Sequence, residues 1–589
     1  MNIIDASISN KTFEYLRNVF KKDISLSELN NTLHQDTGIV NFFDNQYEFN
    51  SFKDTISSQG CESDNPEKAE YGDFQTNVDL ANKVVEYLNT KNTSPDIIIE
   101  PTCGKGNFIL AAINNFKHAE AIYGIEIYKP YIWECKFNII DFYLNNPREI
   151  KPDIIIHHFN VFDFNFAKIE KTHKNKKILI IGNPPWVTNS KLGSLSSNNL
   201  PRKVNFKKHN GIDAITGKGN FDIAEYISNL LINTFKESNG EIALLIKNSV
   251  IKNIISEQLR NNYNIANIEK LCIDSKKEFN VSVEASLFYC KLNSTPEYDC
   301  KEMNFYQSFK VIKRFGWYEQ KFISNIDSYK NIKNIDGESP FIWRQGIKHD
   351  CTAVMELTIS NGLFTNKMNE TVELENDLVY GFLKSSDLKS KVVSQTRKYT
   401  IITQRNVGQE TSFIKDKFPK TYTYLIEHKD FFNSRKSSIY KGKPLFSIFG
   451  IGDYSFCPYK IAISGLYKTF HFTLVTPQNN KPIMLDDTCY FIGFDNLEFA
   501  VYTLILLNSV QTINLLQAIT FPDAKRTFTK EILMRINLLE IAKNIDIEYL
   551  QKEINALNLE YNVSLQSWNA YIKKITPTKD KQLSLFAYM

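Results

Sequence analysis

The sequence has little that is typical of secreted, membrane or zinc-binding proteins. Its nine cysteines are scattered along 589 residues and form no C-x-x-C pair, which argues against a disulfide framework and against a zinc site. The N-terminus has no basic segment followed by an apolar one, and no uninterrupted apolar run approaches the length of a membrane span. We therefore expect a soluble cytoplasmic protein with reduced thiols, no bound metal and no membrane partner.

A strong net charge is also missing. The formal net charge is only +4, so any contact with nucleic acid must be a local patch rather than a property of the whole surface. Hydrophobic residues make up 42% of the chain and aromatic residues 13%, which is enough to build sizeable cores and argues against global disorder. The length predicts two domains or more.

A strand, a glycine turn and a helix follow one another near residue 100. Residues 96–100 predict a short strand, and residues 108–115 have the apolar spacing of a helix. Gly104 and Gly106 stand between them, where a glycine lets a ligand approach the backbone and the N–H groups of the helix start. This unit is typical of the nucleotide-binding turn of doubly wound folds.

Polar side chains stand at the ends of four successive predicted strands. The strands are predicted at residues 96–100, 121–126, 153–157 and 178–182, and the polar residues are Glu100, Glu126, Asp163 and Asn183. Because the carboxyl ends of parallel strands meet at one edge, where open sheets bind ligands, the pattern predicts one site. Further strands at 241–247, 268–273 and 286–292 complete a seven-stranded Rossmann-like α/β domain that ends near residue 300.

Asn183-Pro184-Pro185-Trp186 follows the fourth strand. The prolines fix φ and lack N–H groups, so the peptide carbonyls beside them face away from any sheet partner. The turn thus offers an amide oxygen, a fixed carbonyl and a flat ring, which suits an exocyclic amino group on a planar base.

The chain beyond residue 300 loses the alternation of strands and helices. Basic, aromatic and Ser/Thr residues are mixed there in stretches interrupted by glycines, a composition that suits binding to the phosphates and base edges of a DNA groove. We expect a mixed α+β domain, closed by a helical segment at 538–589. The DNA-contact candidates are Arg344, Lys384, Arg435, Lys436, Tyr454 and Arg526, together with Arg202, Lys203 and Lys207 in the long loop after Trp186.

In the order of these motifs the chain resembles the adenine-N6 DNA methyltransferases of type II restriction–modification systems, which use S-adenosyl-L-methionine. The resemblance covers residues 71–300, with the cofactor loop first and the N-P-P-aromatic motif second, and extends loosely over 340–530, where Arg435-Lys-Ser-Ser and Gly450-Ile-Gly-Asp-Tyr look like recognition-domain signatures. It implies an N-terminal extension over 1–65, a methyltransferase domain over 66–300 and a target-recognition domain over 301–537.

The resemblance also implies roles for individual residues. It places Phe74 and Thr76 over the methionine part of the cofactor, with Glu100, Cys103, Gly104, Gly106 and Asn183 around it, Glu126 at the ribose and Asp163 at the adenine amino group. Asn183, Pro184, Pro185 and Trp186 form the catalytic motif, in which the family most often has Tyr or Phe where this chain has Trp186. A second aromatic residue, Phe288 or Tyr289, is expected on the opposite face of the flipped target base.

The implied partners are double-stranded DNA and a cognate restriction endonuclease that acts separately. Three alternatives stay open at this point: the same chemistry on RNA or on a protein glutamine, a fused restriction–modification enzyme, and a DNA-binding subunit without catalysis. The intact Asn183 argues against the last, and residues 1–65 are too short for a nuclease domain.

Overall fold

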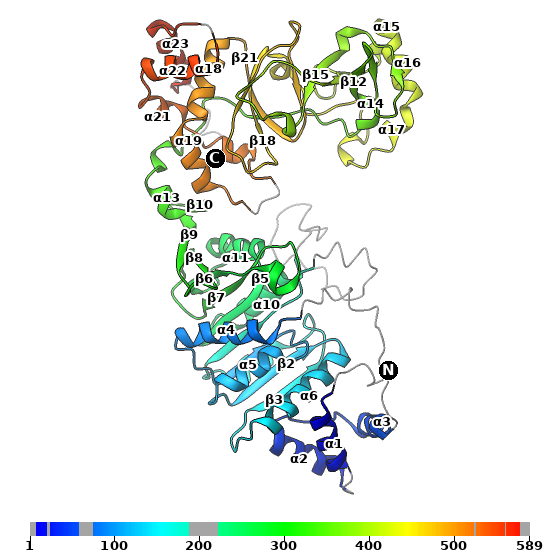
Figure 1. The fold of residues 1–589 in the computed structure, drawn as a ribbon, viewed down its shortest axis with the longest axis vertical. Helices are drawn as coiled ribbons and strands as arrows, with labels where there is room; N and C mark the ends of the chain where they lie inside the picture. Colours follow the sequence, from blue (N-terminus) through cyan, green and yellow to red (C-terminus); the bar gives the residue numbers. More distant parts are fainter. Residues whose placement is uncertain are drawn as a thin grey trace. The chain divides into compact units, whose positions relative to one another are not determined.

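The computed structural model describes residues 8–20, 24–57, 75–187, 222–522, 526–559 and 561–577 (Figure 1). The chain divides into two compact units, Met1–Phe322 and Ile323–Met589. Phe74, Arg202, Lys203 and Lys207 lie outside the described residues, so their expected roles stay predictions.

A ten-stranded sheet forms the centre of the first unit, in the order β10-β9-β8-β6-β7-β5-β4-β1-β2-β3. The strands are β1 (Ile97–Glu100), β2 (Ala121–Glu126), β3 (Asp153–His158), β4 (Ile178–Gly182), β5 (Gly240–Lys247), β6 (Ala266–Cys272), β7 (Ala285–Lys291), β8 (Asp299–Asn304), β9 (Val311–Tyr318) and β10 (Lys321–Ile323). The run from β3 to β5 is parallel, and β7 lies antiparallel between β5 and β6. The expected seven-stranded Rossmann-like domain is therefore present, with three more strands added beyond β6.

Helices connect and cover these strands. They are α4 (Val78–Thr90), α5 (Asn107–Asn115), α6 (Lys129–Asn145), α7 (Phe166–Thr172), α10 (Ile223–Phe235), α11 (Asn248–Asn261) and α12 (Ser275–Phe279). Strands β1 and β4 are buried along their whole length. Continuous apolar runs such as Ile178–Gly182 form central strands because both faces of a parallel sheet are covered.

Three N-terminal helices protect one edge of this sheet: α1 (Asn10–Phe20), α2 (Leu26–Thr37) and α3 (Gln46–Ser57). Phe20, Phe43 and Phe52 pack together, and Phe52 lies 5.0 Å from Trp133 of α6, measured between ring centroids. Ile39 bridges to Ile154 of the outermost strand β3. The extension thus covers a strand edge that would otherwise expose its backbone polar groups.

The division between the two units lies later than the expected boundary at residue 300. Strand β8 pairs in parallel with β6, and β9 pairs with β8, so both extend the first sheet. The indole nitrogen of Trp317 in β9 also donates to the carbonyl oxygens of Ile255 and Ser256 in α11. The alternation of strands and helices therefore ends near residue 300, but the first unit continues beyond it.

The second unit is a mixed α+β structure, as the sequence predicted, with two sheets ordered β11-β21-β18-β19-β16 and β14-β13-β12-β17-β15-β20. The strands are β11 (Arg344–Gln345), β12 (Glu356–Ser360), β13 (Leu363–Thr365), β14 (Thr371–Val372), β15 (Val379–Leu383), β16 (Val392–Val393), β17 (Lys398–Ile401), β18 (Tyr459–Ser464), β19 (Thr473–Val475), β20 (Met484–Leu485) and β21 (Cys489–Phe494). The helices are α13 (Ile326–Lys330), α14 (Thr352–Met355), α15 (Phe413–Lys417), α16 (Pro419–Glu427), α17 (Lys429–Asn433), α18 (Leu497–Leu507), α19 (Val510–Ile519), α20 (Lys530–Leu533), α21 (Leu538–Ala542), α22 (Ile547–Ala556) and α23 (Leu565–Ile575).

Two apolar helices of the second unit, α18 and α19, follow one another directly in the chain. Within the described part of the chain, no single helix is long and apolar enough to cross a membrane, although these two together meet the length and composition test with a 58° bend between them. Residues 500–507 of α18 are buried inside the unit.

Candidate functional site

A pocket lies at the carboxyl ends of β1, β2, β3 and β4, where the sequence placed its ligand site. Its walls come from the segment before α4, the glycine turn after β1, the end of β2, the turn after β3 and the turn after β4. The polar lining residues include Gln75, Thr76, Glu100, Asn107, Glu126, Asn160 and Asn183, and the apolar ones include Tyr128, Tyr131, Phe162, Pro184, Pro185 and Ile223.

The glycine turn holds its shape because both glycines have left-handed φ angles. Gly104 has φ +49° and Gly106 has φ +81°, a region in which L side chains are strained. A Cβ atom on Gly106 would lie 2.5 Å from Cys135 Sγ of α6, so helix and turn pack without room for a side chain. Cys103 lies beside them in the pocket wall, and its N–H donates to Ile125 O at 2.9 Å.

Glu100 places a carboxyl group in the wall with little access to water. Its side chain is 3% exposed, and Oε2 has no hydrogen-bond partner within the described parts of the chain. Burial raises the pKa of this carboxyl well above its ordinary value, and the nearby Cys135 and Glu126 raise it further. A cationic donor in the pocket would supply the missing hydrogen bond and favour the ionised form.

Glu126 ends β2 and turns back onto the glycine turn. Its Oε2 accepts from Gly104 N at 2.9 Å and its Oε1 accepts from Tyr128 N at 2.8 Å. These two backbone bonds fix the carboxylate in the pocket wall. The structure thus brings Glu126 to Gly104, as the sequence predicted.

The turn after β3 differs from the prediction. Asp163 is exposed and lies outside the pocket lining, whereas Asn160, Val161 and Phe162 line it. Asn160 Oδ1 accepts from Phe162 N at 3.0 Å, and Asn160 O accepts from Asp163 N at 3.0 Å, so the chain turns before it reaches Asp163. Asn160 is therefore the polar residue that this strand contributes to the pocket.

Asn183 joins the turn after β4 to the segment before α4 and to the turn after β1. Its Nδ2 donates to Thr76 Oγ1 at 3.2 Å, and its backbone oxygen accepts from Thr102 Oγ1 at 3.4 Å. The first bond fixes the plane of the amide, because the amide nitrogen has to face Thr76. Pro184 and Pro185 continue the same wall.

Trp186 is anchored to the neighbouring strand by its indole nitrogen. Nε1 donates to Leu245 O of β5 at 3.1 Å, and the side chain is 6% exposed. β4 pairs with β5 only as far as Gly182 with Leu244, and the prolines that follow have no N–H to continue the ladder. The indole N–H therefore satisfies a strand carbonyl that lies beyond the end of the ladder.

One aromatic neighbour of Trp186 within the described residues is Phe279, which the sequence analysis did not identify. Phe279 ends α12, is partly exposed, and its ring lies 4.9 Å from the Trp186 ring in an edge-to-face arrangement. Phe288 and Tyr289 are both 0% exposed in β7, between β5 and β6, and neither lines the pocket. Trp186 and Phe279 are also absent from the pocket lining, so the structure shows that Phe279 packs on Trp186, while a stacking role for either ring stays a prediction.

These features fit the cofactor that the resemblance implies. The buried oxygen Glu100 Oε2, which has no donor among the described residues, suits the α-ammonium group of S-adenosyl-L-methionine. The turn at Gly104 and Gly106 leaves its backbone open for close approach, since neither residue carries a Cβ. Among the described residues, no group of three or more His, Cys, Asp or Glu side chains could hold a metal ion.

The DNA-contact candidates of the second unit fall into two groups. Lys384 and Arg435 are used inside the unit: Lys384 Nζ lies 2.5 Å from the buried Glu356 Oε1, and Arg435 donates to the carbonyl oxygens of Phe432, His349, Ser447 and Leu445. These bonds give both side chains a structural role inside the unit, and their expected contact with phosphate stays a prediction. Arg344 lies over the ring of Tyr454 at 4.9 Å, Lys436 is exposed, and Arg526 is partly exposed beside Asp487.

Comparison with known proteins identifies a close relative. The chain is 42% identical over 480 residues to the type II methyltransferase M.NspV of Nostoc sp., a match that covers 81% of this chain and 98% of that protein. The solved structure of the type IIL restriction–modification enzyme MmeI in complex with DNA is similar with a TM-score of 0.50 and 12% identity, over 86% of this chain and 71% of that one. No family model matches the chain.

Proposed function

Because this chain belongs to the type II methyltransferase family, we propose that it methylates N6 of adenine at a specific sequence in double-stranded DNA. One observation carries the proposal: Asn183, Pro184 and Pro185 line the same pocket as Glu100 and Glu126. A target base bound by Asn183 and the prolines would therefore lie next to a cofactor bound by Glu100 and Glu126. Transfer between two bound molecules requires this proximity.

We assign the cofactor side of the pocket to S-adenosyl-L-methionine, which supplies an activated methyl group when bound. Glu100 binds its ammonium group, Glu126 its ribose hydroxyls, and Thr76 and Gly104 border its methionine part. Asn160 takes the role first expected of Asp163 at the adenine amino group, because only Asn160 lines the pocket. An amide oxygen accepts from an amino group as a carboxylate does.

On the target side, Asn183 and Pro184 act on the amino group of a flipped adenine. The amino nitrogen is a poor nucleophile because its lone pair is delocalised into the ring. The Asn183 side-chain oxygen and the Pro184 carbonyl accept its two hydrogens, which favours a pyramidal nitrogen with a localised lone pair. Neither residue has to remove a proton first, because the nitrogen loses its proton more easily once it carries the methyl group.

Trp186 and Phe279 stabilise the base outside the duplex. Extruding a base costs a few kcal/mol of stacking, and stacking on one aromatic ring recovers roughly 1–3 kcal/mol. Trp186 is held by its bond to Leu245, so the base stacks on a fixed ring. Phe279 is partly exposed at the end of a short helix and packs edge-to-face on Trp186, so it borders the place assigned to the base.

The second unit is assigned to DNA recognition, and the protein to a type II restriction–modification system in the cytoplasm with a separate endonuclease. Lys436, Arg344 and Arg526 are its cationic candidates for contact with DNA, since all three are at least partly exposed. Cations that neutralise phosphates make binding weaker as salt rises. Affinity for DNA is therefore expected to fall with ionic strength.

Sequencing of genomic DNA from a methylation-free host that expresses this protein tests the proposal. A single sequence motif with N6-methyladenine at one position is the expected result. Absence of any modified adenine would refute it, and assays with RNA and protein substrates would then follow.

Three variants test the assigned residues in the same assays. Asn183→Ala should abolish methyl transfer and retain cofactor binding, and near-normal turnover would exclude its role. Asn160→Ala should weaken cofactor binding, whereas Asp163→Ala, a change in the same turn outside the pocket, should leave it unchanged. Weaker binding in Asp163→Ala alone would reverse this assignment.

A further inference from the structure

Three segments of the second unit approach each other at the turn between β20 and β21. A Cβ atom on Gly346 would lie 2.2 Å from Asp486 O, and one on Gly450, where φ is +69°, would lie 2.2 Å from Gly346 O. Ile347 N donates to Leu485 O at 2.6 Å. Backbones in such close contact leave little freedom, so side chains that project from this point are held in defined positions.

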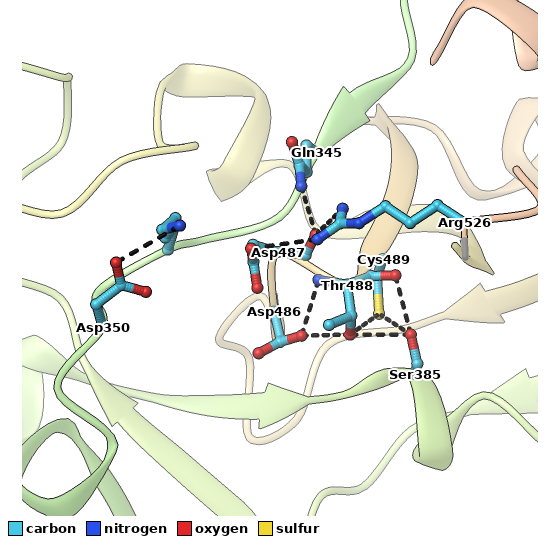
Figure 2. Close-up of polar contacts among 9 residues, drawn as sticks. Gln345, Asp350, Ser385, Asp486, Asp487, Thr488, Cys489 and Arg526 are labelled. Atoms are coloured by element: carbon cyan, nitrogen blue, oxygen red, sulfur yellow. Dashed lines mark hydrogen bonds and ion pairs between the residues drawn. The ribbon is translucent and has the colours of Figure 1, made fainter. Parts of the chain in front are cut away.

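The turn itself is built by its first and last residues. Asp486 Oδ1 accepts from Thr488 N at 2.8 Å and also from the Thr488 hydroxyl. Ser385 Oγ donates to Thr488 O and to Thr488 Oγ1, both at 2.9 Å (Figure 2). Asp486 is therefore used in the turn, and Asp487 is the residue that the turn presents.

Asp487 is held by two side chains from distant parts of the chain. Its backbone oxygen accepts from Gln345 Nε2 at 2.6 Å and from Arg526 Nη1 at 3.1 Å. Its carboxylate Oδ2 lies 3.6 Å from Arg526 Nη2, and the two side chains keep 25% and 34% of their surface exposed. The result is a fixed acceptor beside a fixed cationic donor, both accessible to a ligand (Figure 2).

We infer that Asp487 and Arg526 together recognise one C·G base pair in the major groove of the target DNA. The inference rests on the proposed function, and it assigns part of the sequence specificity. Cytosine presents its N4 amino group as a donor, which a carboxylate accepts, and guanine presents O6 and N7, which an arginine binds. An adjacent carboxylate and guanidinium match the donor and acceptors of this pair.

A carboxylate on a DNA-binding surface has few other favourable partners. Phosphate groups repel it, so it weakens non-specific binding. The amino groups on base edges attract it, and among these cytosine N4 is the one that an acid reads in the major groove. Gln345 acts as a positioning residue for Asp487, because it binds the backbone oxygen of Asp487; Arg526 binds the same oxygen in addition to its contact with guanine.

The first experiment compares Asp487→Asn and Asp350→Asn in the full-length protein. Asp350 is an exposed acid of the same region, 3.5 Å from Lys348 Nζ, and controls for the loss of one negative charge (Figure 2). Methylated sites are sequenced in a methylation-free host. Asp487→Asn should relax the preference at one C·G position on the order of 10- to 100-fold, whereas Asp350→Asn should keep the wild-type motif.

The second experiment uses the wild-type protein and changes the DNA. In synthetic duplexes of the motif, each cytosine in turn is replaced by 2-pyrimidinone, which lacks the 4-amino group. One replacement should lower kcat/KM of the wild type on the order of 10- to 100-fold and cause no further loss in Asp487→Ala. Additive losses at every cytosine would overturn the inference.

The outcomes separate this inference from the proposed function. Absence of adenine methylation by the wild type would refute both. Methylation of a motif that contains no C·G pair, or an unchanged motif in Asp487→Asn, would overturn the inference alone. A folded Asp487→Asn protein that loses activity equally on all site variants would also overturn it, since the ion pair would then be structural only.

Discussion

Replacement of Trp186 by phenylalanine should separate the anchoring of this ring from its stacking surface. Phenylalanine keeps an aromatic face but has no N–H, so Leu245 O loses its donor. Leu245 is 0% exposed, and water therefore cannot replace the lost bond. A buried acceptor left without a partner costs about 1–3 kcal/mol.

This cost should appear in both stability and rate. For a domain of this size, 1 kcal/mol lowers Tm by roughly 2–4 °C, so a decrease of roughly 2–12 °C is expected. Because each 1.4 kcal/mol corresponds to a factor of ten, a loss of the same size in the transition state should slow methyl transfer roughly 5- to 150-fold. Cofactor affinity should be unchanged, since Glu100 and Glu126 do not contact the indole.

The measurements are thermal unfolding, calorimetry with the cofactor and single-turnover methylation with saturating DNA. Trp317→Phe is the matched control, because the Trp317 indole also donates to backbone carbonyls, those of Ile255 and Ser256, but belongs to β9 and not to the turn that follows β4. This control should lose stability and keep its methylation rate. If Trp186→Phe were as stable and as fast as the wild type, the anchoring argument would be refuted.

Three further predictions concern Glu100, Arg435 and Lys460. Burial raises the pKa of the Glu100 carboxyl, so this group should lose its proton when the ammonium group of the cofactor binds. Cofactor binding should therefore weaken as pH falls through that pKa. Calorimetry in two buffers of different ionisation enthalpy should detect the proton release in the wild type and not in Glu100→Gln. Arg435→Ala should lower the free energy of unfolding by about 3 kcal/mol, because several backbone carbonyls lose a charged donor. Lys436→Ala should leave the free energy of unfolding unchanged and reduce the salt dependence of DNA binding. Equal stability of the two variants would contradict the structural role of Arg435. Burial lowers the pKa of Lys460 to about 7, so between this pH and the ordinary lysine pKa the unfolded chain binds one proton more than the folded chain. The free energy of unfolding of the wild type should therefore rise with pH relative to that of Lys460→Met, by up to about 1.4 kcal/mol per pH unit. Urea denaturation at pH 7 and pH 9 tests this, and an equal change in both proteins would exclude it.

The sheet and its functional edge could be predicted because two simple rules determine them. Apolar runs such as that of β4 form central strands, and parallel strands bring their carboxyl ends to one edge. Glu100, Glu126 and Asn183 are therefore found together, as expected. No side-chain detail was needed for this part of the site.

The turn after β3 could not be predicted from residue types alone. Asn160 and Asp163 are both polar and both follow the strand, and the acid was the more obvious candidate. The choice is made by the hydrogen bonds of the turn, which direct Asn160 inward and Asp163 outward. Such local geometry depends on neighbouring segments as well as on the sequence of the turn.

The second aromatic residue was missed for a related reason. Phe288 and Tyr289 are fully buried in a strand that pairs on both sides, and neither is among the pocket-lining residues. Phe279 stands before that strand, followed by Asn280 in the left-handed conformation that ends α12. An aromatic residue at a helix end next to an Asn was the available signal, since such positions are exposed more often than strand interiors.

The charged residues of the second unit show that composition cannot separate contact with a partner from internal structure. Loops without regular secondary structure still need donors for their buried carbonyl groups. Arg435 supplies them to the segments that contain His349 and Ser447, and its ring contact with Tyr440 at 3.7 Å adds to its fixation. The same Arg435-Lys-Ser-Ser stretch leaves Lys436 exposed, so adjacent cations in one motif have different tasks.

The two sides of the pocket are fixed by different kinds of bonds, and this determines how each should respond to substitution. On the cofactor side, Glu126 accepts from two backbone N–H groups, those of Gly104 and Tyr128. Backbone donors remain when neighbouring side chains are replaced. On the target side, Asn183 and Trp186 are held through their own side-chain nitrogens, to Thr76 and Leu245. A substitution on the target side removes both the functional group and its support, so it should reduce turnover far more than cofactor affinity. Thr76→Val, which keeps the shape of the side chain but removes the acceptor for Asn183, should therefore lower the methylation rate while the cofactor still binds.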